Sequence, residues 1–340
     1  MKKCRIIALT HADLVPPDNP RETTDLSEVD WKTEFDVVST LRDLGHEVQV
    51  VGVRDDLGVI REAVSDFKPH IAFNLLEEFD GVGVYDQNVV AYLELLRLPY
   101  TGCNPRGLIL ARDKGLARQV MAYHRIPFPA FRVFPVGRKI RIRKPHFPLI
   151  VKSISQEASL GIAQASVVEN EDKLRERIAF IHESIRTDAI VEQYIQGREL
   201  YVGLIGNARL KVLPVWELDL NGMPMELRRI ATARVKWSSK YQKKYAIKSG
   251  PAEDLPNGLS RQIQRMAKRV FRALNLSGYA RVDIRLDSNG GVHVLEANPN
   301  PQISFGEDFA ESAESAGISY ETLMQSLVTL GLRWKPDRLR

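Results

Sequence analysis

The sequence lacks the features that distinguish disulfide-rich, metal-binding and membrane proteins from ordinary intracellular globular proteins. Only 2 of its 340 residues are cysteines, Cys4 and Cys103, and their separation fits neither a disulfide framework nor a metal site. The apolar run after Met1 is too short for a signal peptide or a membrane span, and no other segment approaches that length. The 7 histidines show no metal-binding spacing. We therefore expect a reduced, cytoplasmic protein with no membrane partner.

Charge of one sign is not in excess either, because 48 Lys and Arg face 43 Asp and Glu, giving a formal net charge of +5. That balance suits anionic ligands without calling for nucleic acid. One basic run, residues 138–144, alternates with isoleucine and lacks the aromatic residues of RNA-binding segments. We interpret it as an exposed edge strand whose charges block pairing, and we expect no nucleic-acid partner.

The first hundred residues alternate short apolar runs with helical patterns, which is typical of a parallel sheet covered by helices. Strands are expected at 5–9, 48–53 and 71–74, and helices at 56–67 and 87–96.

Strands dominate further along the chain, so we expect an α/β protein with an α+β C-terminal half. The expected helices there are 113–124, 173–184, 259–274 and 320–330. The expected domains are 1–112, 113–195 and 196–340. A polar stretch, 228–254, shows no clear core face and is expected to be a mobile loop.

The strongest local signal is a hairpin motif in the C-terminal part. Asn289-Gly290 between two β-prone runs is a favoured turn. With these two residues at the turn centre, Asp283 faces Glu296 on one face of the hairpin. The same register puts Arg281 opposite Asn298. The other face, which includes Leu295, would be a core face.

Two carboxylates directly opposite each other destabilise a hairpin unless something neutralises them. The oxygens of Asp283, Glu296 and Asn298 suit Mg²⁺, with Mn²⁺ as a substitute. The alternative is a solvated strand face on which Arg281 and Arg285 pair with the acids. A register slip at the turn would weaken the facing argument but keep the cluster.

Two further signals suit a nucleotide. Lys114 opens a helix, and Lys152 ends an apolar strand before the loop 153–161, where lysines can hold phosphate oxygens. In the run 191–200, a strand passes into polar groups that could present Glu192 to adenine and Glu199 to ribose hydroxyls. Taken singly, each lysine would be a surface charge and the run an exposed turn.

Taken together, the motifs resemble the ATP-grasp superfamily, and the D-alanine–D-alanine ligase group most closely, over nearly the whole chain. The matching segments follow the family's order: Leu98–Gly102 with Asp113-Lys114, Pro148–Lys152, Glu192 with Glu199, Lys240-Tyr241 nine residues before Pro251-Ala252, and Arg281 with Asp283, Glu296 and Asn298.

The resemblance implies an ATP-grasp fold with an N-terminal Rossmann-like domain. It implies an ADP-forming ligase in which a carboxylate takes the γ-phosphate of ATP and an amine attacks the acyl-phosphate, joining amino acids or a small peptide. It assigns ATP binding to Lys114, Lys152, Ser159, Glu192, Gln193, Tyr194, Ile195 and Glu199. It assigns magnesium to Asp283, Glu296 and Asn298, and catalysis to Arg281, Lys240 and Tyr241.

The substrate pocket departs from this family pattern. Ala158 stands where the family has a serine, and no glycine-rich loop is recognisable after the first strand, where only Glu22 or Glu28 offers a substitute acid. Glu307 and Asp308 stand where serines hold the acceptor's carboxylate, and acids would repel that group.

The favoured hypothesis is therefore an amino-acid or peptide ligase related to D-alanine–D-alanine ligase. The alternatives are that ligase itself, serving cell-wall synthesis, an ATP-grasp phosphotransferase, and a non-catalytic nucleotide-binding module. Arg281 favours a ligase over a phosphotransferase, since the tetrahedral step needs an oxyanion partner. The intact set of lysines and acids argues against the non-catalytic module. A homodimer is left open.

Overall fold

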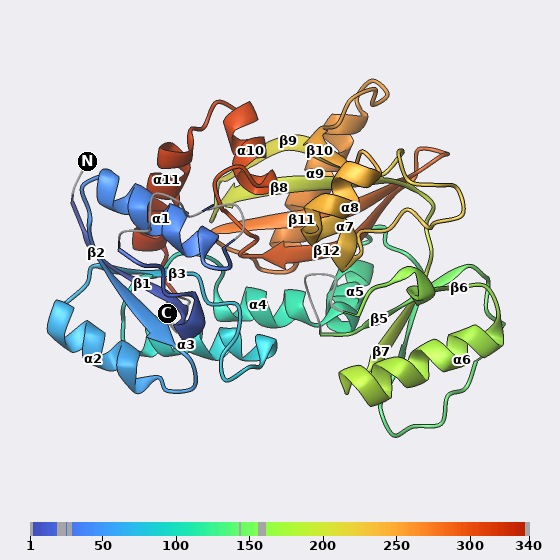
Figure 1. The fold of residues 1–340 in the computed structure, drawn as a ribbon, viewed down its shortest axis with the longest axis horizontal. Coiled ribbons are helices and arrows are strands. Elements are labelled where there is room, and N and C mark those ends of the chain that lie inside the picture. The colour runs from blue at the N-terminus through green and yellow to red at the C-terminus, as the bar shows by residue number, and fades with distance from the viewer. Residues whose placement is uncertain (1–2, 19–24, 26–28, 143, 156–160, 337–340) are drawn as a thin grey trace.

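The computed structural model describes residues 3–18, 25, 29–142, 144–155 and 161–336. Its elements form three sheets, shown in Figure 1. The first is parallel, with strand order β2–β1–β3, and consists of β1 (Arg5–His11), β2 (Glu47–Val53) and β3 (Ile71–Asn74). The parallel sheet expected from the sequence is confirmed.

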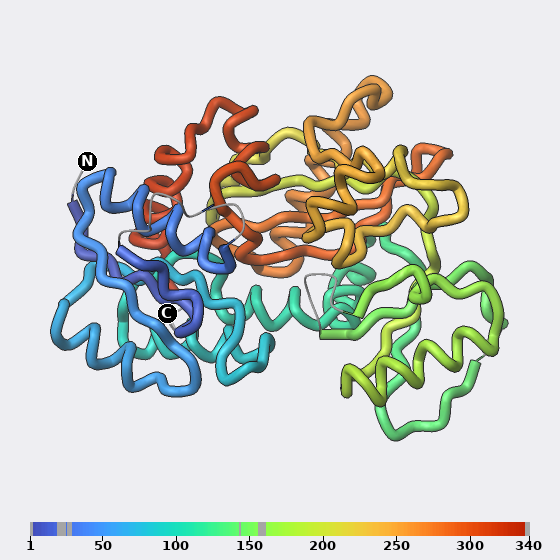
Figure 2. The backbone as a smooth tube through the Cα atoms, in the orientation of Figure 1, coloured from blue at the N-terminus to red at the C-terminus, as the bar shows by residue number. Residues whose placement is uncertain are grey.

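Alternate residues of β1 enter two different cores, because successive side chains of a strand point to opposite faces. Ile7 and Leu9 pack in one core with α2 (Gly58–Phe67) and α3 (Asp86–Leu95). Ile6 packs in the other core with α1 (Lys32–Asp43) and α11 (Tyr320–Arg333). Figure 2 shows the red C-terminal segment returning beside the blue N-terminal one, so the last helix completes the first layer.

The second sheet is antiparallel, with strand order β4–β7–β5–β6, and α6 (Glu171–Phe180) packs on it. Its strands are β4 (Phe131–Phe134), β5 (Leu149–Ser153), β6 (Val167–Val168) and β7 (Ala189–Gln193). The described residues of the basic run 138–144 form no strand, so the edge-strand expectation was wrong. Ile140 and Ile142 pack against the core of this sheet, which explains why isoleucines alternate with the charges.

The third sheet has the order β10–β9–β8–β11–β12 and is also antiparallel. Its strands are β8 (Gly197–Gly206), β9 (Leu210–Asp219), β10 (Lys248–Pro251), β11 (Tyr279–Asp287) and β12 (Val292–Pro299). The amphipathic helix α9 (Leu259–Ala273) packs Ile263 and Val270 into its core, as the sequence predicted. Three further helices are α4 (Pro105–Arg112), α5 (Lys114–Tyr123) and α10 (Asp308–Ser315).

The polar stretch 228–254 is not the coreless loop that we expected. It contains α7 (Ala233–Trp237), α8 (Ser239–Lys244) and β10, which pairs with β9. Val235 and Ile247 are buried in one cluster with Trp216 and Leu218. Two core residues twelve positions apart give no periodic signal, so the sequence pattern could not reveal this packing.

Each sheet falls within one of the three expected domain ranges, although α11 packs on the first sheet. The boundaries at 112 and 195 stay a prediction. No helix among the described residues is both long and apolar enough to span a membrane.

The first and third sheets meet where two backbone segments approach closely. Cys103 N–H donates to Asn300 Oδ1 at 2.7 Å, and Asn104 Nδ2 donates to the Asn275 carbonyl at 2.8 Å. Gly278 has φ +71°, and a Cβ added there would collide with the carbonyl oxygen of Gly102.

Gly278→Ala should destabilise the fold by roughly 2–5 kcal/mol, because positive φ costs roughly 1–2 and the forced backbone separation roughly 1–3. Gly290→Ala is the matched control, since Gly290 has φ +82° with nothing within 4 Å of an added Cβ. Urea unfolding of both variants measures the difference. Equal losses would show that the close approach at Gly278 carries no energy of its own.

Candidate functional site

The β11–β12 hairpin pairs Asp283 with Glu296 and Arg281 with Asn298, in the register that the sequence predicted. The turn is longer than expected, however. Near it the register shifts by one residue, so that Ile284 faces Val294. An irregularity between Asp283 and Ile284 restores the predicted pairing further on.

At this irregularity β12 carries one more residue than β11, and this changes which side chains of β12 reach the core. Val294 is fully buried, whereas Leu295 is only partly buried, so the expectation that Leu295 lies on the core face was wrong. A bulge re-aims the side chains on either side of it. Here it keeps Glu296 beside Asp283.

Arg281 and Asn298 both hold the carboxylate of Asp283. Arg281 donates from Nε to Oδ1 at 2.7 Å and from Nη2 to Oδ2 at 3.0 Å. Asn298 donates from Nδ2 to Oδ2 at 3.0 Å. The Arg281 guanidinium also lies 4.6 Å from the ring centre of Tyr201, which fixes its orientation. A strand face without metal would show the same ion pair, so the surroundings of Glu296 decide between the two interpretations.

Lysines from three separate segments of the chain act on the carboxylate of Glu296. Its Oε2 lies 3.7 Å from Lys114 Nζ at the start of α5. Burial raises the pKa of Glu296, but Lys114, Lys152 and Lys236, with Arg281, outweigh it and hold the pKa at about 2. A solvated strand face would not draw lysines from α5, β5 and α7 to one carboxylate. The arrangement instead suits a polyphosphate lying between the lysines and the hairpin.

The donor set of the hairpin fits a magnesium ion bound together with phosphates. Burial raises the pKa of Asp283 and the charge of Glu296 adds to it, against Arg281, so a divalent cation would relieve a real repulsion. Among the described residues, no group of three or more His, Cys, Asp and Glu side chains could hold a metal by itself. Two carboxylates and one amide leave positions for waters and phosphate oxygens, as Mg²⁺ prefers.

A buried ion cluster joins Lys152 to Glu192. Glu192 is completely buried and accepts from Lys152 Nζ at 2.8 Å through Oε2. Its Oε1 accepts from Arg118 Nε at 3.1 Å and Nη2 at 2.6 Å. Burial alone would raise the pKa of Glu192, but Arg118 and Lys152 hold it at about 2.

Arg118 is a residue that the sequence analysis missed. It also donates to the carbonyl of Leu295, the residue before Glu296, and so links the ion cluster to the bulge of β12. A signal did exist in the sequence, because Arg118 lies four residues after Lys114 and therefore on the same helix face.

Glu199, expected at the ribose, is buried and paired. Its Oε2 accepts from Arg285 Nη2 at 2.6 Å, and its Oε1 accepts from Tyr201 at 3.3 Å. The same Arg285 donates to the carbonyls of Gly197 and Arg229, each at 3.0 Å.

In the segment expected to bind adenine, residues 192–195, two backbone N–H groups are already hydrogen-bonded to other parts of the chain. Gln193 N–H donates to the Ala130 carbonyl at 2.8 Å and Tyr194 N–H to the Pro148 carbonyl at 3.1 Å. Tyr194 is buried, Gln193 exposed and Ile195 intermediate. Ser159, like Ala158, Glu22 and Glu28, lies outside the described residues.

Two lysines of the 228–254 segment, Lys236 and Lys240, differ in their position. Lys240 is exposed on α8, and its neighbour Tyr241 packs edge-on against Tyr245, with 4.7 Å between ring centres. Lys236 on α7 is partly buried, and its charge lowers the pKa of both Asp283 and Glu296. The sequence analysis missed Lys236, although Lys236-Trp237 repeats the Lys-aromatic pattern of Lys240-Tyr241 four residues earlier.

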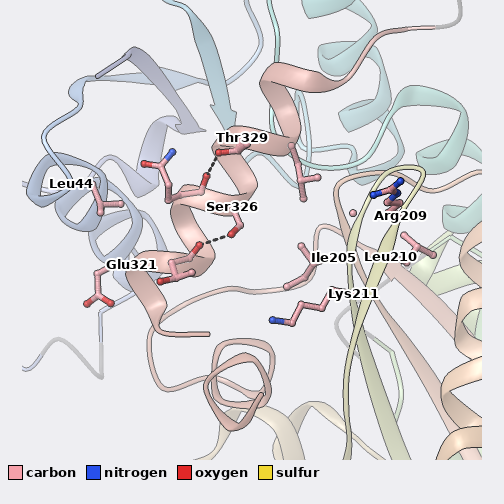
Figure 3. Close-up of a pocket in the computed structure, with 12 residues that line it drawn as sticks. Leu44, Ile205, Arg209, Leu210, Lys211, Glu321, Ser326 and Thr329 are labelled. Atoms are coloured by element: carbon pink, nitrogen blue, oxygen red, sulfur yellow. Dashed lines mark hydrogen bonds between the residues drawn. The ribbon is translucent and has the colours of Figure 1, made fainter. Parts of the chain in front are cut away.

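A cavity of about 730 Å³ lies elsewhere, between α11 and the turn that joins β8 to β9. Figure 3 shows Glu321 and Thr329 on the helix side and Ile205 and Lys211 on the strand side. None of its lining residues belongs to the hairpin or the ion cluster. We therefore place the functional site at the β11–β12 hairpin.

Comparison with known proteins identifies the family of the chain. A family model described as the D-ala D-ala ligase C-terminus matches residues 137–329, which include β5, β6 and β7 of the second sheet, α7, α8 and the hairpin. The chain belongs to the D-alanine–D-alanine ligase family. A D-alanine–D-alanine ligase of Desulforudis audaxviator is 29% identical over 307 residues, which cover 89% of this chain and 94% of that protein.

Two other proteins extend the comparison. The uncharacterized protein y4sG of Sinorhizobium fredii is 30% identical over 305 residues, covering 87% of this chain and 86% of that protein. The fold matches the crystal structure of a Bacillus anthracis D-alanine–D-alanine ligase complexed with ATP. That match has a TM-score of 0.74 and 21% identity, and it covers 97% of this chain and 98% of that one.

Family membership makes the chain an ADP-forming ATP-grasp carbon–nitrogen ligase, which uses ATP to join amino acids through an amide bond. The expected fold class and enzyme class are thereby confirmed. The roles of the individual site residues stay predictions.

Arg118→Met should raise the KM for ATP about tenfold or more, because Glu192 and the β12 bulge lose the partner that positions them. Removing one member of a buried ion cluster also costs about 3–5 kcal/mol, so Arg118→Lys is a milder second variant. Steady-state ADP release measures the KM.

The matched control is Arg112→Met, which breaks a buried pair with Asp86 beside the first sheet. That variant should lower the melting temperature and leave the KM for ATP unchanged. A similar KM increase in both variants would reduce Arg118 to a general stabiliser.

Proposed function

We propose that ATP binds between the second sheet and the β11–β12 hairpin, with its phosphates between Glu296 and the three lysines 114, 152 and 236. The convergence of these lysines on one acidic hairpin is the observation that carries the proposal. Asp283, Glu296 and Asn298 would hold Mg²⁺, or Mn²⁺ in its place. The bound ion would offset the charge of the transferring phosphoryl group.

The adenine would lie along the segment 192–195, where Glu192 also orients the Lys152 ammonium. Ile195 follows two residues whose N–H groups serve the sheet, so its backbone is the natural adenine contact. Glu199 would meet the ribose hydroxyls while Arg285 holds its other oxygen, Oε2. Ser159 completes the phosphate loop in this assignment.

The chemistry then follows in two steps. A substrate carboxylate oxygen attacks the γ-phosphorus, and ADP leaves. The acceptor's neutral amine attacks the carbonyl carbon of the acyl-phosphate, and phosphate leaves as the C–N bond is completed. Arg281, oriented by Asp283 and Tyr201, stabilises the oxyanion of the tetrahedral intermediate.

The substrates would be small amino acids or peptides, handled in the cytoplasm. Asp308 supports a departure from D-alanine as acceptor, because its charge acts on the Arg281 guanidinium. An acid at that position supplies no donor for an acceptor's carboxylate. We expect poor D-alanyl-D-alanine synthesis for this reason.

Glu296→Gln should lower turnover about 100-fold or more, since roughly 2.7 kcal/mol of transition-state charge stabilisation is lost with the metal ligand. ADP release across a magnesium titration measures the effect. Glu314→Gln, on an exposed position of α10, is the control. Full activity of Glu296→Gln with an unchanged magnesium dependence would contradict the metal assignment.

Lys236→Gln should reduce kcat more than Lys240→Gln, because the charge of Lys236 already acts on Asp283 and Glu296 whereas Lys240 is exposed. The expected loss at position 236 is about tenfold to 100-fold, as for one lost phosphate contact of 1.4–2.7 kcal/mol. Both variants are compared by single-turnover ADP formation. A larger loss in Lys240→Gln than in Lys236→Gln would assign the phosphate contact to Lys240, with Tyr241, as the family pattern implies.

A further inference from the structure

The cavity of about 730 Å³ between α11 and the β8–β9 turn has no part in the proposed function. One of its walls is a face of α11, and the other consists of the end of β8, the turn and the start of β9 (Figure 3). Because α11 packs on the first sheet while β8 and β9 belong to the third, the cavity lies at the junction of two layers. Ligand sites of this size are common at such junctions.

The lining of the cavity is largely apolar. Ile205 and Leu210 contribute hydrocarbon side chains from the strand wall, Leu330 from the helix wall, and Leu44 from the end of α1. Ile205 is buried, and the three leucines are partly buried. A ligand with an apolar body would remove further area of these side chains from water.

Two hydroxyl groups on the α11 wall already have partners within the helix. Ser326 Oγ donates to the Thr322 carbonyl at 2.7 Å, and Thr329 Oγ1 donates to the Gln325 carbonyl at 2.8 Å (Figure 3). Gln325 Oε1 also shares a hydrogen bond of 3.1 Å with His46 Nε2. Both hydroxyl hydrogens are therefore occupied, and the helix wall offers little that would select a polar ligand group.

The acid on this wall, Glu321, is held at the start of α11. Hydrogen bonds from its own backbone N–H and from Ser319 lower the pKa of Glu321. A carboxylate in the first turn of a helix is also stabilised by the helix dipole. Figure 3 shows Glu321 on the side of Leu44, directed away from Lys211.

The strand wall carries two cations. Arg209, in the turn, and Lys211, at the start of β9, form no ion pair and no side-chain hydrogen bond with any residue that the structure describes. Figure 3 shows Lys211 extending from the strand wall toward the helix wall. Both cations line the same cavity as Ile205 and Leu330, so one ligand can contact the charged and the apolar groups together.

The turn that carries Arg209 is fixed on both sides. Asn207 Oδ1 accepts from Gly278 N–H at 2.9 Å, and Asn207 Nδ2 donates to the Leu330 carbonyl at 3.2 Å. The turn is also tight, because a Cβ added to Gly206 would lie 2.0 Å from the Arg209 carbonyl oxygen. The strand wall is therefore formed before any ligand binds, as is usual for small-molecule sites.

We propose that this cavity binds a small organic anion with an apolar body, whose carboxylate or phosphate group pairs with Lys211 and Arg209. The site is separate from the β11–β12 hairpin, and the proposal goes beyond the ligase reaction. A guanidinium can bind either oxyanion through two hydrogen bonds, and an ammonium adds a compact charge. The bound molecule contacts both walls and so holds α11 against the third sheet.

The test uses probes that share one hydrocarbon tail and differ in the group at its end. Titration calorimetry of the full chain compares 4-phenylbutyrate and 4-phenylbutyl phosphate with 4-phenylbutylamine and 4-phenylbutanol. At least one of the two anions should bind about tenfold or more tightly than the amine and the alcohol, because only the anions pair with the cations. The tighter anion shows whether the natural ligand is a carboxylate or a phosphate. Acetate and inorganic phosphate, which lack the tail, should bind at least tenfold more weakly.

Lys211→Glu and Arg209→Glu should each weaken binding of the anion about tenfold or more and leave the affinity for the alcohol unchanged. Both residues are exposed, so the fold should be unaffected. Arg61→Glu, at an exposed position of α2, is the matched control and should bind the anion like the native protein. Hydrogen exchange locates the site, since the anion should slow exchange in residues 205–211 and 322–330.

Equal affinities for the anions and the alcohol would overturn the inference, as would the absence of binding by any probe at millimolar concentration. An equal loss in Arg61→Glu and Lys211→Glu would overturn it too, because it would show an effect of net charge alone. Slower exchange at the β11–β12 hairpin and not at α11 would place the anion in the proposed ATP site, which also contradicts the inference. Each outcome is independent of whether the chain joins amino acids.

Discussion

The contact of Arg118 with both Glu192 and the Leu295 carbonyl holds together the segments proposed to bind the nucleotide. It joins α5, β7 and β12, which belong to different parts of the chain. Buried charges are tolerated only when their partners are fixed in good geometry, so this cluster sets the spacing of the segments that carry it. Lys152 is thereby aimed from β5, and the bulge of β12 is held where Glu296 can face Asp283.

The same cluster explains how three lysines can stand close together before any nucleotide arrives. Like charges would repel at this spacing, but Glu192 and Glu296 each hold cations around them. A polyphosphate that enters the site brings its own negative charge and can take over part of this pairing. Because these charged groups are already in place, little rearrangement is needed when phosphoryl transfer occurs.

The sequence predicted the hairpin register correctly although it misplaced the turn. A longer turn and a bulge shift the pairing in opposite directions, so Asp283 still faces Glu296. Between the turn and the bulge the pairing differs from the predicted one, and there Val294 rather than Leu295 is buried. Periodic segments such as α9 and β1 were equally accessible, because one face of each is apolar throughout. Lys236 shares a Lys-aromatic pattern with Lys240-Tyr241, but the pattern does not tell which of the two lysines acts on Glu296, because that depends on how distant segments pack.

The lysines that act on Glu296 and the acid Asp308, whose charge acts on Arg281, bring opposite charges to the two ends of the proposed site. Acids near an amine favour its protonated form, and a protonated amine cannot attack a carbonyl. Acids placed to hold the nucleophile itself would therefore slow the second step.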